Sequence, residues 1–556
     1  MEPAALEELK AKFRKAMDSD LNTSMGVTAL FDVLKAKTND ATKLALIGDF
    51  DSVLSLGLLE KAAAKRAEAA QAKTTQTESG YTVTGEGDPA IDALVLARYE
   101  AKKAKNFAEA DRIRDELKAQ GIEITDIPGT AYIAPTGEGS GFHPVACPSY
   151  EEVCADKTAY ARATKIQYDE HDPIRGCAVL QPCQGRVLVV NPPARPLSRE
   201  ALDALYDLPY VREVHPMYRE EVPAIEEVRF SITHNRGCFG GCNFCALAFH
   251  QGRMVTSRSI ESVVREAELL TQDPKFKGYI HDVGGPSANF RHTSCRQQKE
   301  HGMCKGKSCL APEPCKNLDA DHSEYTELLQ RMRKIPGIKK VFVRSGIRYD
   351  YMLQDRNKDF FKELVDYHIS GQLKVAPEHC VSAVLDYMGK PHFDVFLKFW
   401  RQYQKLNESD GREQYLVPYL MSSHPGCTLN DAVELAVFLK RTGHQPEQVQ
   451  DFYPTPGTMS TCMYYTGIDP RTMQEVYVAR DPHDKALQRA LLQWGRGDKR
   501  SLVIEALEKT ERTDLIGFTP DCLIRPVKGE KYFGLKPEER QQPPKKKKDG
   551  RPPKPE

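Results

Sequence analysis

The first 130 residues place apolar side chains at the spacing of an α-helix. Leu6, Leu9, Phe13 and Met17 fall on one helical face. A second helix is predicted to start after Asn22-Thr23 and to bury four apolar residues, Val27, Leu30, Phe31 and Leu34. A third is predicted to follow Phe107, Ala110, Ile113 and Leu117 and to end at Gly121, a capping glycine. The pattern therefore predicts an all-α N-terminal domain.

Two polar stretches interrupt the apolar pattern. Residues 72–88 are rich in Thr and Gly, and residues 135–141 read PTGEGSG. Both compositions are typical of loops or linkers. The chain closes on PPKKKKDGRPPKPE, a low-complexity basic sequence that predicts a disordered, solvated tail.

From about residue 226 the pattern changes to short β-rich runs separated by amphipathic helices. Strands are predicted at residues 228–233, 278–283, 340–345, 372–376, 414–421 and 448–453, and helices between them include 259–270 and 430–441. Strands that alternate with helices form parallel sheets, and the loops at the strand C-termini carry the chemistry. The sequence therefore predicts an α/β fold, and six such units would form an incomplete barrel.

Composition narrows the function classes. The chain has 556 residues, of which 40% are hydrophobic and 28% charged, as expected of a globular protein with several domains. Lys+Arg and Asp+Glu both total 78, so the net charge offers no general attraction to nucleic acid. No apolar run approaches the ~18 residues of a membrane span, and the start has no signal-peptide core. We expect a cytoplasmic protein.

Cysteine is frequent and unevenly placed. There are 15 cysteines, none before Cys147, and seven of them lie between Cys238 and Cys315. Disulfides are rare in a reducing compartment, so clustered cysteines indicate metal binding or catalysis. Three of the seven, Cys238, Cys242 and Cys245, are spaced C-x3-C-x2-C directly after the first predicted barrel strand.

This triad predicts an iron–sulfur centre. Three thiolates can hold three irons of a [4Fe-4S] cluster and leave one iron open, whereas structural zinc requires four closed ligands. Glycines interleaved with the triad let the backbone wrap closely around a cluster: Gly237, Gly240 and Gly241. The alternative is a zinc site with a distant fourth ligand.

The triad, with Phe244 before its last cysteine, resembles the motif of the radical S-adenosylmethionine (SAM) superfamily. The resemblance implies that the open iron binds SAM and that reductive cleavage of SAM gives methionine and a 5′-deoxyadenosyl radical. It also implies a Gly-Gly segment after the second strand to receive the SAM amino group. Gly284-Gly285 stands there, followed by Pro286 where an acidic residue is common.

Further fragments resemble the YgiQ-type radical SAM family from about residue 143 to 527. They are NRGCFGGC, DVGGPSANF, VRSGIRYD, LKVAPEH, MGKP, QYLVPYLMSSHPG and QVQDFYPTPGTMSTCMYYTG. Three residues near strand ends become candidates for contacts to SAM, namely Ser345, Arg348 and Lys374. Members carry a longer N-terminal region resembling a cobalamin-binding domain. Only its final part is recognisable here, so no complete cobalamin site is expected.

A second cysteine group follows the Gly-Gly segment. Cys295, Cys304, Cys309 and Cys315 are spaced C-x8-C-x4-C-x5-C among Lys, His and Pro residues. Four thiolates suit zinc or an auxiliary iron–sulfur cluster, and the spacing does not separate the two. The alternative is free surface thiols or a regulatory disulfide. The other cysteines are scattered, as small buried hydrophobes are.

Residues 1 to about 134 resemble the C-terminal helical domain of cysteinyl-tRNA synthetase, through MDSDLNTSMGVTALFDVLK and ARYEAKKAKNFAEADRIRDELKAQGIEITDIPGTAY. In that family the domain helps contact tRNA. The chain lacks HIGH-type and KMSKS-type motifs, so no amino-acid activation is expected. A fusion of two gene fragments accounts for the pairing, and packing is favoured over retained tRNA binding.

The resulting interpretation is a radical SAM enzyme of unknown substrate and unknown catalytic residues, served by a reducing partner such as flavodoxin or ferredoxin. The expected fold is an incomplete (β/α)6 TIM-like barrel behind an all-α domain. The divisions are a helical domain 1–134, a linker 135–142, a truncated α/β piece 143–225, the barrel 226–500, an extension 501–530 and a tail 531–556. The alternatives are an RNA- or tRNA-binding protein with a structural cluster, or a synthetase remnant without ligase activity.

Overall fold

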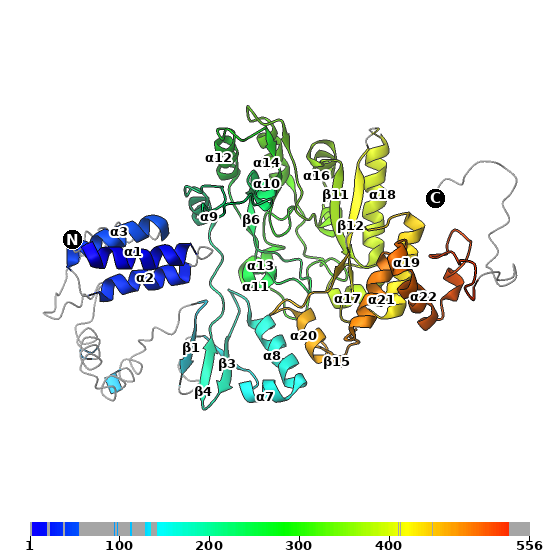
Figure 1. The fold of residues 1–556 in the computed structure, drawn as a ribbon, viewed down its shortest axis with the longest axis horizontal. Coiled ribbons are helices and arrows are strands. Elements are labelled where there is room, and N and C mark those ends of the chain that lie inside the picture. Colours follow the sequence, from blue (N-terminus) through cyan, green and yellow to red (C-terminus); the bar gives the residue numbers. More distant parts are fainter. Residues whose placement is uncertain are drawn as a thin grey trace. The chain divides into compact units, whose positions relative to one another are not determined.

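The computed structural model describes most of the chain (Figure 1). The described residues are 3–18, 23–36, 39–54, 128–134, 142–409, 411, 413–446 and 449–532, with the isolated residues 94, 97, 112 and 113. The predicted linkers at 72–88 and 135–141 and the basic tail from residue 533 lie outside them, as does nearly all of the predicted helix at 107–117. The chain forms two compact units, Met1–Ile124 with Glu213–Pro223, and Thr125–Arg212 with Ala224–Glu556.

Among the described residues of the first unit, three helices surround a core of their own. They are α1 (Pro3–Met17), α2 (Thr23–Lys35) and α3 (Asp40–Leu54). Phe13 of α1 and Phe50 of α3 stack with their ring centroids 4.0 Å apart. The predicted buried face of α2 is wrong at Phe31 and Leu34, which are 53% and 48% exposed, because α2 turns Val33 inward instead.

The second unit begins with a four-stranded sheet in the order β1-β4-β3-β2. Its strands are β1 (Ala131–Ala134), β2 (Pro144–Ala146), β3 (Ala178–Cys183) and β4 (Arg186–Val190). β4 pairs antiparallel with both β1 and β3, and β2 pairs parallel with β3. Helices α7 (Tyr150–Ala155) and α8 (Lys157–Glu170) follow β2, each started by a side-chain cap, Ser149 and Asp156 respectively.

The barrel strands are short and parallel. β5 (Ser231–Thr233) pairs with β9 (Asp282–Gly284), β8 (Tyr279–Ile280) pairs with β10 (Lys340–Val341), and β11 (Gln372–Glu378), β12 (Tyr415–Ser422) and β13 (Gln450–Asp451) form one ladder. The Val343 N–H, two residues beyond β10, donates to the carbonyl of His368, the last residue of the π-helical turn that precedes β11. β8 and β9 are two parts of one strand position, so the described strands fill six positions. The predicted incomplete (β/α)6 barrel is confirmed.

Helices connect and flank these strands. The longer ones are α9 (Arg199–Tyr206), α12 (Ile260–Leu270), α14 (Ser323–Arg333), α18 (Phe393–Ser409), α19 (Leu429–Thr442), α20 (Met459–Thr466), α21 (Pro482–Leu492) and α22 (Arg500–Lys509). The shorter elements are α10 (Ala224–Val228), β6 (Asn235–Arg236), α11 (Leu247–His250), β7 (Thr256–Ser257), α13 (Arg296–His301), α15 (Tyr349–Gln354), α16 (Asp359–Glu363), a π-helical turn (Leu364–His368), α17 (Ser382–Met388), β14 (Ile468–Asp469) and β15 (Gln474–Glu475).

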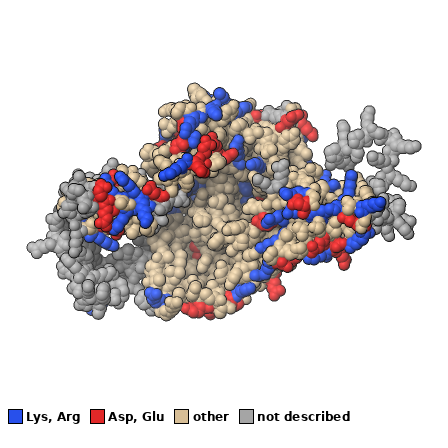
Figure 2. Space-filling model, in the orientation of Figure 1, with Lys and Arg blue, Asp and Glu red and all other residues tan. Residues whose placement is uncertain are grey.

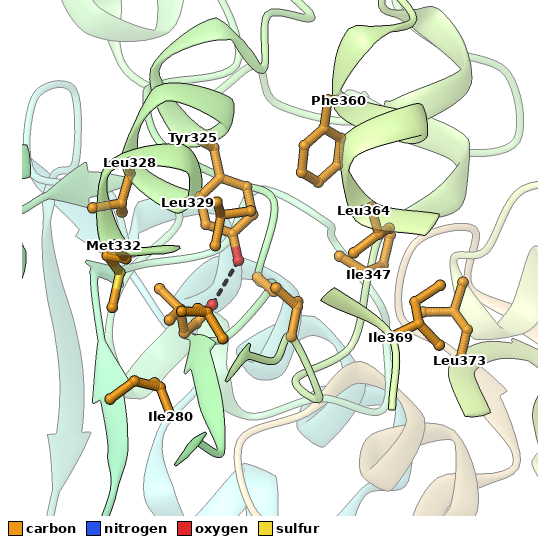
Figure 3. Close-up of a cluster of buried hydrophobic side chains, with 14 of the residues drawn as sticks. Ile280, Tyr325, Leu328, Leu329, Met332, Ile347, Phe360, Leu364, Ile369 and Leu373 are labelled. Carbon is orange, nitrogen blue, oxygen red and sulfur yellow. Dashed lines mark hydrogen bonds between the residues drawn. The ribbon is translucent and has the colours of Figure 1, made fainter. Parts of the chain in front are cut away.

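The core lies between the barrel strands and their helices. Leu328, Leu329 and Met332 of α14, labelled in Figure 3, belong to one buried cluster with Ile280. The Tyr325 hydroxyl donates to the Val283 carbonyl over 2.5 Å. Leu373 of β11 belongs to the same buried cluster. Side chains alternate along a strand, so the residues between the core positions face the barrel interior.

Charge and hydropathy of the surface add two observations. No helix among the described residues is both long enough and apolar enough to cross a bilayer. On the face drawn in Figure 2, Lys and Arg side chains are interspersed with Asp and Glu, including over the helices near the C-terminal end of the described chain.

Candidate active site

The predicted cluster loop leaves β5 through a tight reversal. β6 pairs antiparallel with β7, and the Cys238 N–H donates to the Gly252 carbonyl over 3.1 Å. Gly237 has φ +82°, and a Cβ there would fall on the Met254 carbonyl. Only glycine satisfies both conditions, which explains the glycine directly before the first cysteine.

The three triad cysteines lie on one short loop, in which the Cys245 N–H donates to the Cys242 carbonyl over 3.2 Å. Burial raises the pKa of the Cys238 thiol, and raises that of Cys245 to about 11, with each also affected by the charge of the neighbouring Cys242. The Gly240 N–H points to Cys238 Sγ at 3.4 Å, and the Ser287 hydroxyl lies 3.5 Å from the same sulfur. A buried thiol of this kind becomes a thiolate when a metal replaces its proton.

The end of α17 fixes the other side of the loop. The Asn243 N–H donates to the Met388 carbonyl over 2.8 Å, and its side-chain amide donates to the Tyr387 carbonyl over 2.9 Å. A Cβ at Gly389, which has φ +67°, would lie 2.7 Å from the Gly241 carbonyl. The MGKP segment noted in the sequence therefore packs against the cluster loop and fixes its position.

Arg348 connects the loop to the strand end after β10. Its Nη1 lies 3.4 Å from Cys242 Sγ, and its Nε and Nη2 donate to the Asp350 carboxylate over 2.9 and 2.6 Å. Burial alone would lower the pKa of Arg348, but Asp350 and Cys242 raise it well above its usual value. This predicted site residue thus brings a permanent positive charge to the triad.

Gly284 and Gly285 lie where no side chain would fit. A Cβ at Gly284 would fall on Ser345 and Asp282, and one at Gly285 would fall on Asn235 Oδ1. The Asp282 carboxylate accepts hydrogen bonds from the Ser345 N–H, over 3.0 Å, and from the Ser345 hydroxyl. The structure therefore brings the predicted residues Gly284, Gly285 and Ser345 together around Asp282.

Asn235 supplies an unused acceptor at this point. It is 1% exposed, and its Oδ1 accepts no hydrogen bond from any described residue. A buried acceptor without a donor is costly, so such an atom indicates a missing partner. The ammonium group of an amino acid would supply that donor, which fits the SAM amino group that the Gly-Gly segment is expected to receive.

A buried acid that the sequence did not single out stands at the end of β11. Glu378 has φ +68°, a conformation that non-glycine residues avoid and that concentrates at functional sites. Burial raises the pKa of its carboxyl, and Lys390 Nζ lies 3.9 Å away. LKVAPEH contains this residue, but only the folded chain reveals its strained backbone and its lysine partner.

The remaining predicted contacts are less central. Phe244 packs against the apolar cluster that contains Met388 and Phe452, with its ring centroid 6.1 Å from that of His424. Lys374 is exposed, between the buried Leu373 and Val375, and so lies on the strand face that lines the open barrel. The structure does not bring Lys374 into contact with the triad loop.

The donor set fits a [4Fe-4S] cluster, in which three thiolates bind three of the four irons. Among the described residues, no three His, Cys, Asp or Glu side chains converge on one metal position. In a cluster each thiolate binds a different iron, so the sulfurs need not converge. Residues that would hold the group are the three triad cysteines, with Arg348 as the neighbouring cation.

Known families match successive parts of the chain. Residues 12–74 match the DALR domain, 93–231 the radical SAM N-terminal family, 232–439 the radical SAM superfamily, and 447–551 a domain of unknown function, DUF3362. Residues 93–439 therefore carry domains of the radical SAM superfamily, whose members use a [4Fe-4S] cluster and SAM. A DALR domain precedes the radical SAM domains.

Curated relatives support the predicted resemblance to the YgiQ-type family. A UPF0313 protein of Clostridium perfringens is 54% identical over 407 residues, which are 73% of this chain and 62% of the relative. A UPF0313 protein of Clostridium botulinum is 55% identical over 403 residues, 72% of this chain and 62% of the relative. The chain thus spans about three-fifths of the length of these relatives.

Solved structures resemble the chain more distantly. One is the cobalamin-dependent SAM radical enzyme OxsB with aqua-cobalamin, at 12% identity and TM-score 0.35, over 59% of this chain and 50% of that one. Another is the radical SAM methyltransferase TsrM of Kitasatospora setae with cobalamin and a [4Fe-4S] cluster. It has 12% identity and TM-score 0.29, over 59% of this chain and 71% of that one.

Proposed function

We propose that the chain binds a [4Fe-4S] cluster through Cys238, Cys242 and Cys245 and reductively cleaves SAM to methionine and a 5′-deoxyadenosyl radical. The substrate of that radical is unknown. The observation that carries the proposal is the gathering of three thiols beside a Gly-Gly segment whose neighbour, Asn235, holds an unused buried acceptor. A reduced cluster supplies the single electron that breaks the sulfonium C–S bond.

The chain's own residues would bind and orient SAM. Asn235 Oδ1 would accept a hydrogen bond from the SAM amino group, and the absence of side chains at Gly284 and Gly285 lets Ser345, Asp282 and Asn235 pack directly against this backbone segment. Asp282 holds Ser345 at the adjacent strand end. The Arg348 guanidinium would stabilise negative charge on the triad sulfurs, because it is buried and already directed at Cys242.

The proposal also concerns partners. Superfamily enzymes require a reductant, and a flavodoxin or ferredoxin would supply the electron here. Contact with tRNA through the DALR domain remains a prediction.

The test uses the full chain, reconstituted anaerobically with iron and sulfide, reduced with dithionite and mixed with SAM. We expect 5′-deoxyadenosine and methionine in equal amounts by liquid chromatography, slowly in the absence of substrate. Changing Cys238, Cys242 and Cys245 together to Ala should abolish both products. The matched control is Cys183→Ala, which removes a thiol from β3, away from the barrel strands.

Two outcomes would contradict the proposal. Intact SAM after treatment of protein with a full, reduced cluster would exclude the enzyme and leave a structural cluster, as in the RNA-binding alternative. Unchanged SAM cleavage by the triple variant would show that other residues hold the active cluster.

A further inference from the structure

The loop between β9 and α14 carries four cysteines that the proposed SAM chemistry does not use. Cys295, Cys304, Cys309 and Cys315 all lie within residues 295–315. All fifteen cysteines of the chain are described, and each is a free thiol. These four thiols are therefore all free to bind a metal.

Backbone and side-chain hydrogen bonds gather three of the thiols. The Ser294 hydroxyl lies between two sulfurs, 4.0 Å from Cys295 Sγ and 3.2 Å from Cys309 Sγ. The Cys315 N–H donates to the Cys309 carbonyl over 2.9 Å. The Asp319 N–H then donates to the Ser294 carbonyl over 2.8 Å and closes the base of the loop.

The fourth cysteine is placed by contacts from α8 and the turn after it. The Met303 N–H donates to Asp172 Oδ2 over 2.7 Å, and Lys305 Nζ lies 2.5 Å from Glu170 Oε1. Cys304 stands between these two anchored residues. These contacts fix the backbone on both sides of Cys304 within the same loop that carries Cys295, Cys309 and Cys315.

The loop has a small apolar core of its own, which it shares with the triad loop. Leu310 packs with Phe239, Phe290 and Tyr351, and the rings of Phe239 and Phe290 stack at 3.9 Å. Cys238 of the triad and Cys309 of the loop both pack against this cluster. The two cysteine groups therefore lie on neighbouring parts of one structure.

Charge in the loop suits an anionic group. Four thiolates concentrate negative charge, and basic residues outnumber acidic ones between positions 295 and 316, through Arg296, Lys299, Lys305, Lys307 and Lys316 against Glu300 and Glu313. Oppositely charged neighbours stabilise ionised ligands. Cys304 is exposed and lines a cavity of about 510 Å³ with Phe239, Gly241 and Ser308, so iron and sulfide have a path to it.

We propose that Cys295, Cys304, Cys309 and Cys315 bind a second iron–sulfur cluster, separate from the cluster of the triad. A cluster spreads its four thiolates over different irons. Its formation would add metal-binding free energy to the stability that the loop gains from its small apolar core.

The experiment measures iron, sulfide and zinc in the full chain after anaerobic purification and reconstitution. We expect about eight irons per chain, two [4Fe-4S] equivalents. The Cys309→Ser/Cys315→Ser variant should lose about half of the iron and sulfide and keep the paramagnetic signal that responds to SAM. The triad variant should lose the other half. Cys183→Ser is the matched control and should lose none.

A second variant tests whether the double variant loses iron only because it fails to fold. Cys304→Ala changes an exposed thiol, so the fold should persist while the second cluster's signal changes and protease cutting between residues 291 and 320 increases. Full iron in both loop variants, or stoichiometric zinc in the wild type, overturns the proposal. If SAM remains intact while the loop variants still lose half of the iron, the second cluster stands and the proposed enzyme function fails.

Discussion

Arg348 and Cys242 meet at 3.4 Å, Nη1 to Sγ, while the rest of the guanidinium is paired with Asp350. If all of the guanidinium donors were paired with one carboxylate, the ion pair would have no net charge and no donor left for a neighbouring group. Here Nη1 of Arg348 remains free to donate to Cys242 Sγ. The Arg348–Asp350 pair therefore places a hydrogen-bond donor and a positive charge next to one of the three cluster cysteines. Both terms favour the more negative, reduced state of a cluster.

The first prediction concerns reduction potential. Arg348→Gln combined with Asp350→Asn removes the charge pair without leaving a buried carboxylate alone. We expect the cluster potential to become more negative by about 60 mV or more, which for one electron corresponds to about 1.4 kcal/mol. A redox titration followed by paramagnetic resonance measures it. Arg344→Gln, an exposed arginine on the same strand end, should leave the potential unchanged. An unaltered potential in the double variant would show that Arg348 serves packing alone.

The second prediction concerns SAM affinity. In Gly285→Ala the new methyl group falls on Asn235 Oδ1 and 3.2 Å from the Asn235 carbonyl, so the acceptor must move. We expect SAM to bind at least about tenfold more weakly, a loss of ~1.4 kcal/mol, with iron content unchanged. Equilibrium dialysis with labelled SAM measures the affinity. Gly346→Ala adds a methyl group in open space and should bind SAM as the wild type does. Equal SAM affinity in the two variants would show that Gly285 is not part of the SAM-binding site.

The strands, the triad and the Gly-Gly segment could be predicted from the sequence because each consists of residues that are adjacent or nearly adjacent in the chain. The features that needed the folded chain are those that join distant residues. Asn235 acquires its role from Gly285, fifty positions later, and Glu378 from Lys390 and an unusual φ. The helix face chosen at Phe31 failed for a related reason: spacing finds the largest apolar residues, whereas contact with α1 and α3 decides that Val33 is buried.

The third prediction concerns acid stability. Burial lowers the pKa of His379 to about 4 and that of His424 to about 3. His424 donates from Nδ1 to the Pro425 carbonyl and accepts from the Ser460 hydroxyl, both at 2.7 Å, as a neutral ring does. The unfolded chain protonates both rings near pH 6.5 and the folded chain does not. Stability is therefore complete above pH 6.5 and falls as the pH drops toward 4.

At pH 5 each ring should cost about 2 kcal/mol of unfolding free energy relative to pH 7. Denaturant unfolding of the full chain at pH 7, 6 and 5 measures how steeply the free energy of unfolding falls with pH. His379→Asn should make this fall less steep, whereas His483→Asn, at an exposed histidine, should leave it unchanged. A slope that is identical in all three proteins would show that His379 is not kept neutral by the fold.

The fourth prediction concerns the helical unit. Phe50 is 1% exposed and stacks on Phe13, so Phe50→Ala should lower the stability of that unit by about 3–5 kcal/mol. Phe31→Ala removes an equally large ring from an exposed position and should cost no more than about 0.5 kcal/mol. Calorimetry of the full chain resolves the effect as a lowered first transition. Equal losses in both variants would mean that Phe31 is buried in solution.

Strand β1 has a practical consequence for dividing the protein. It forms one edge of the four-stranded sheet, and its residues Ala131–Ala134 pair along β4 from Val190 to Val187. A cut placed at the apparent junction, residues 135–141, would remove this strand and bare the backbone N–H and C=O groups of β4. Bare strand edges recruit other chains into aggregates. A separately expressed radical SAM half should therefore begin before Gly129, so that it keeps the strand that seals its sheet.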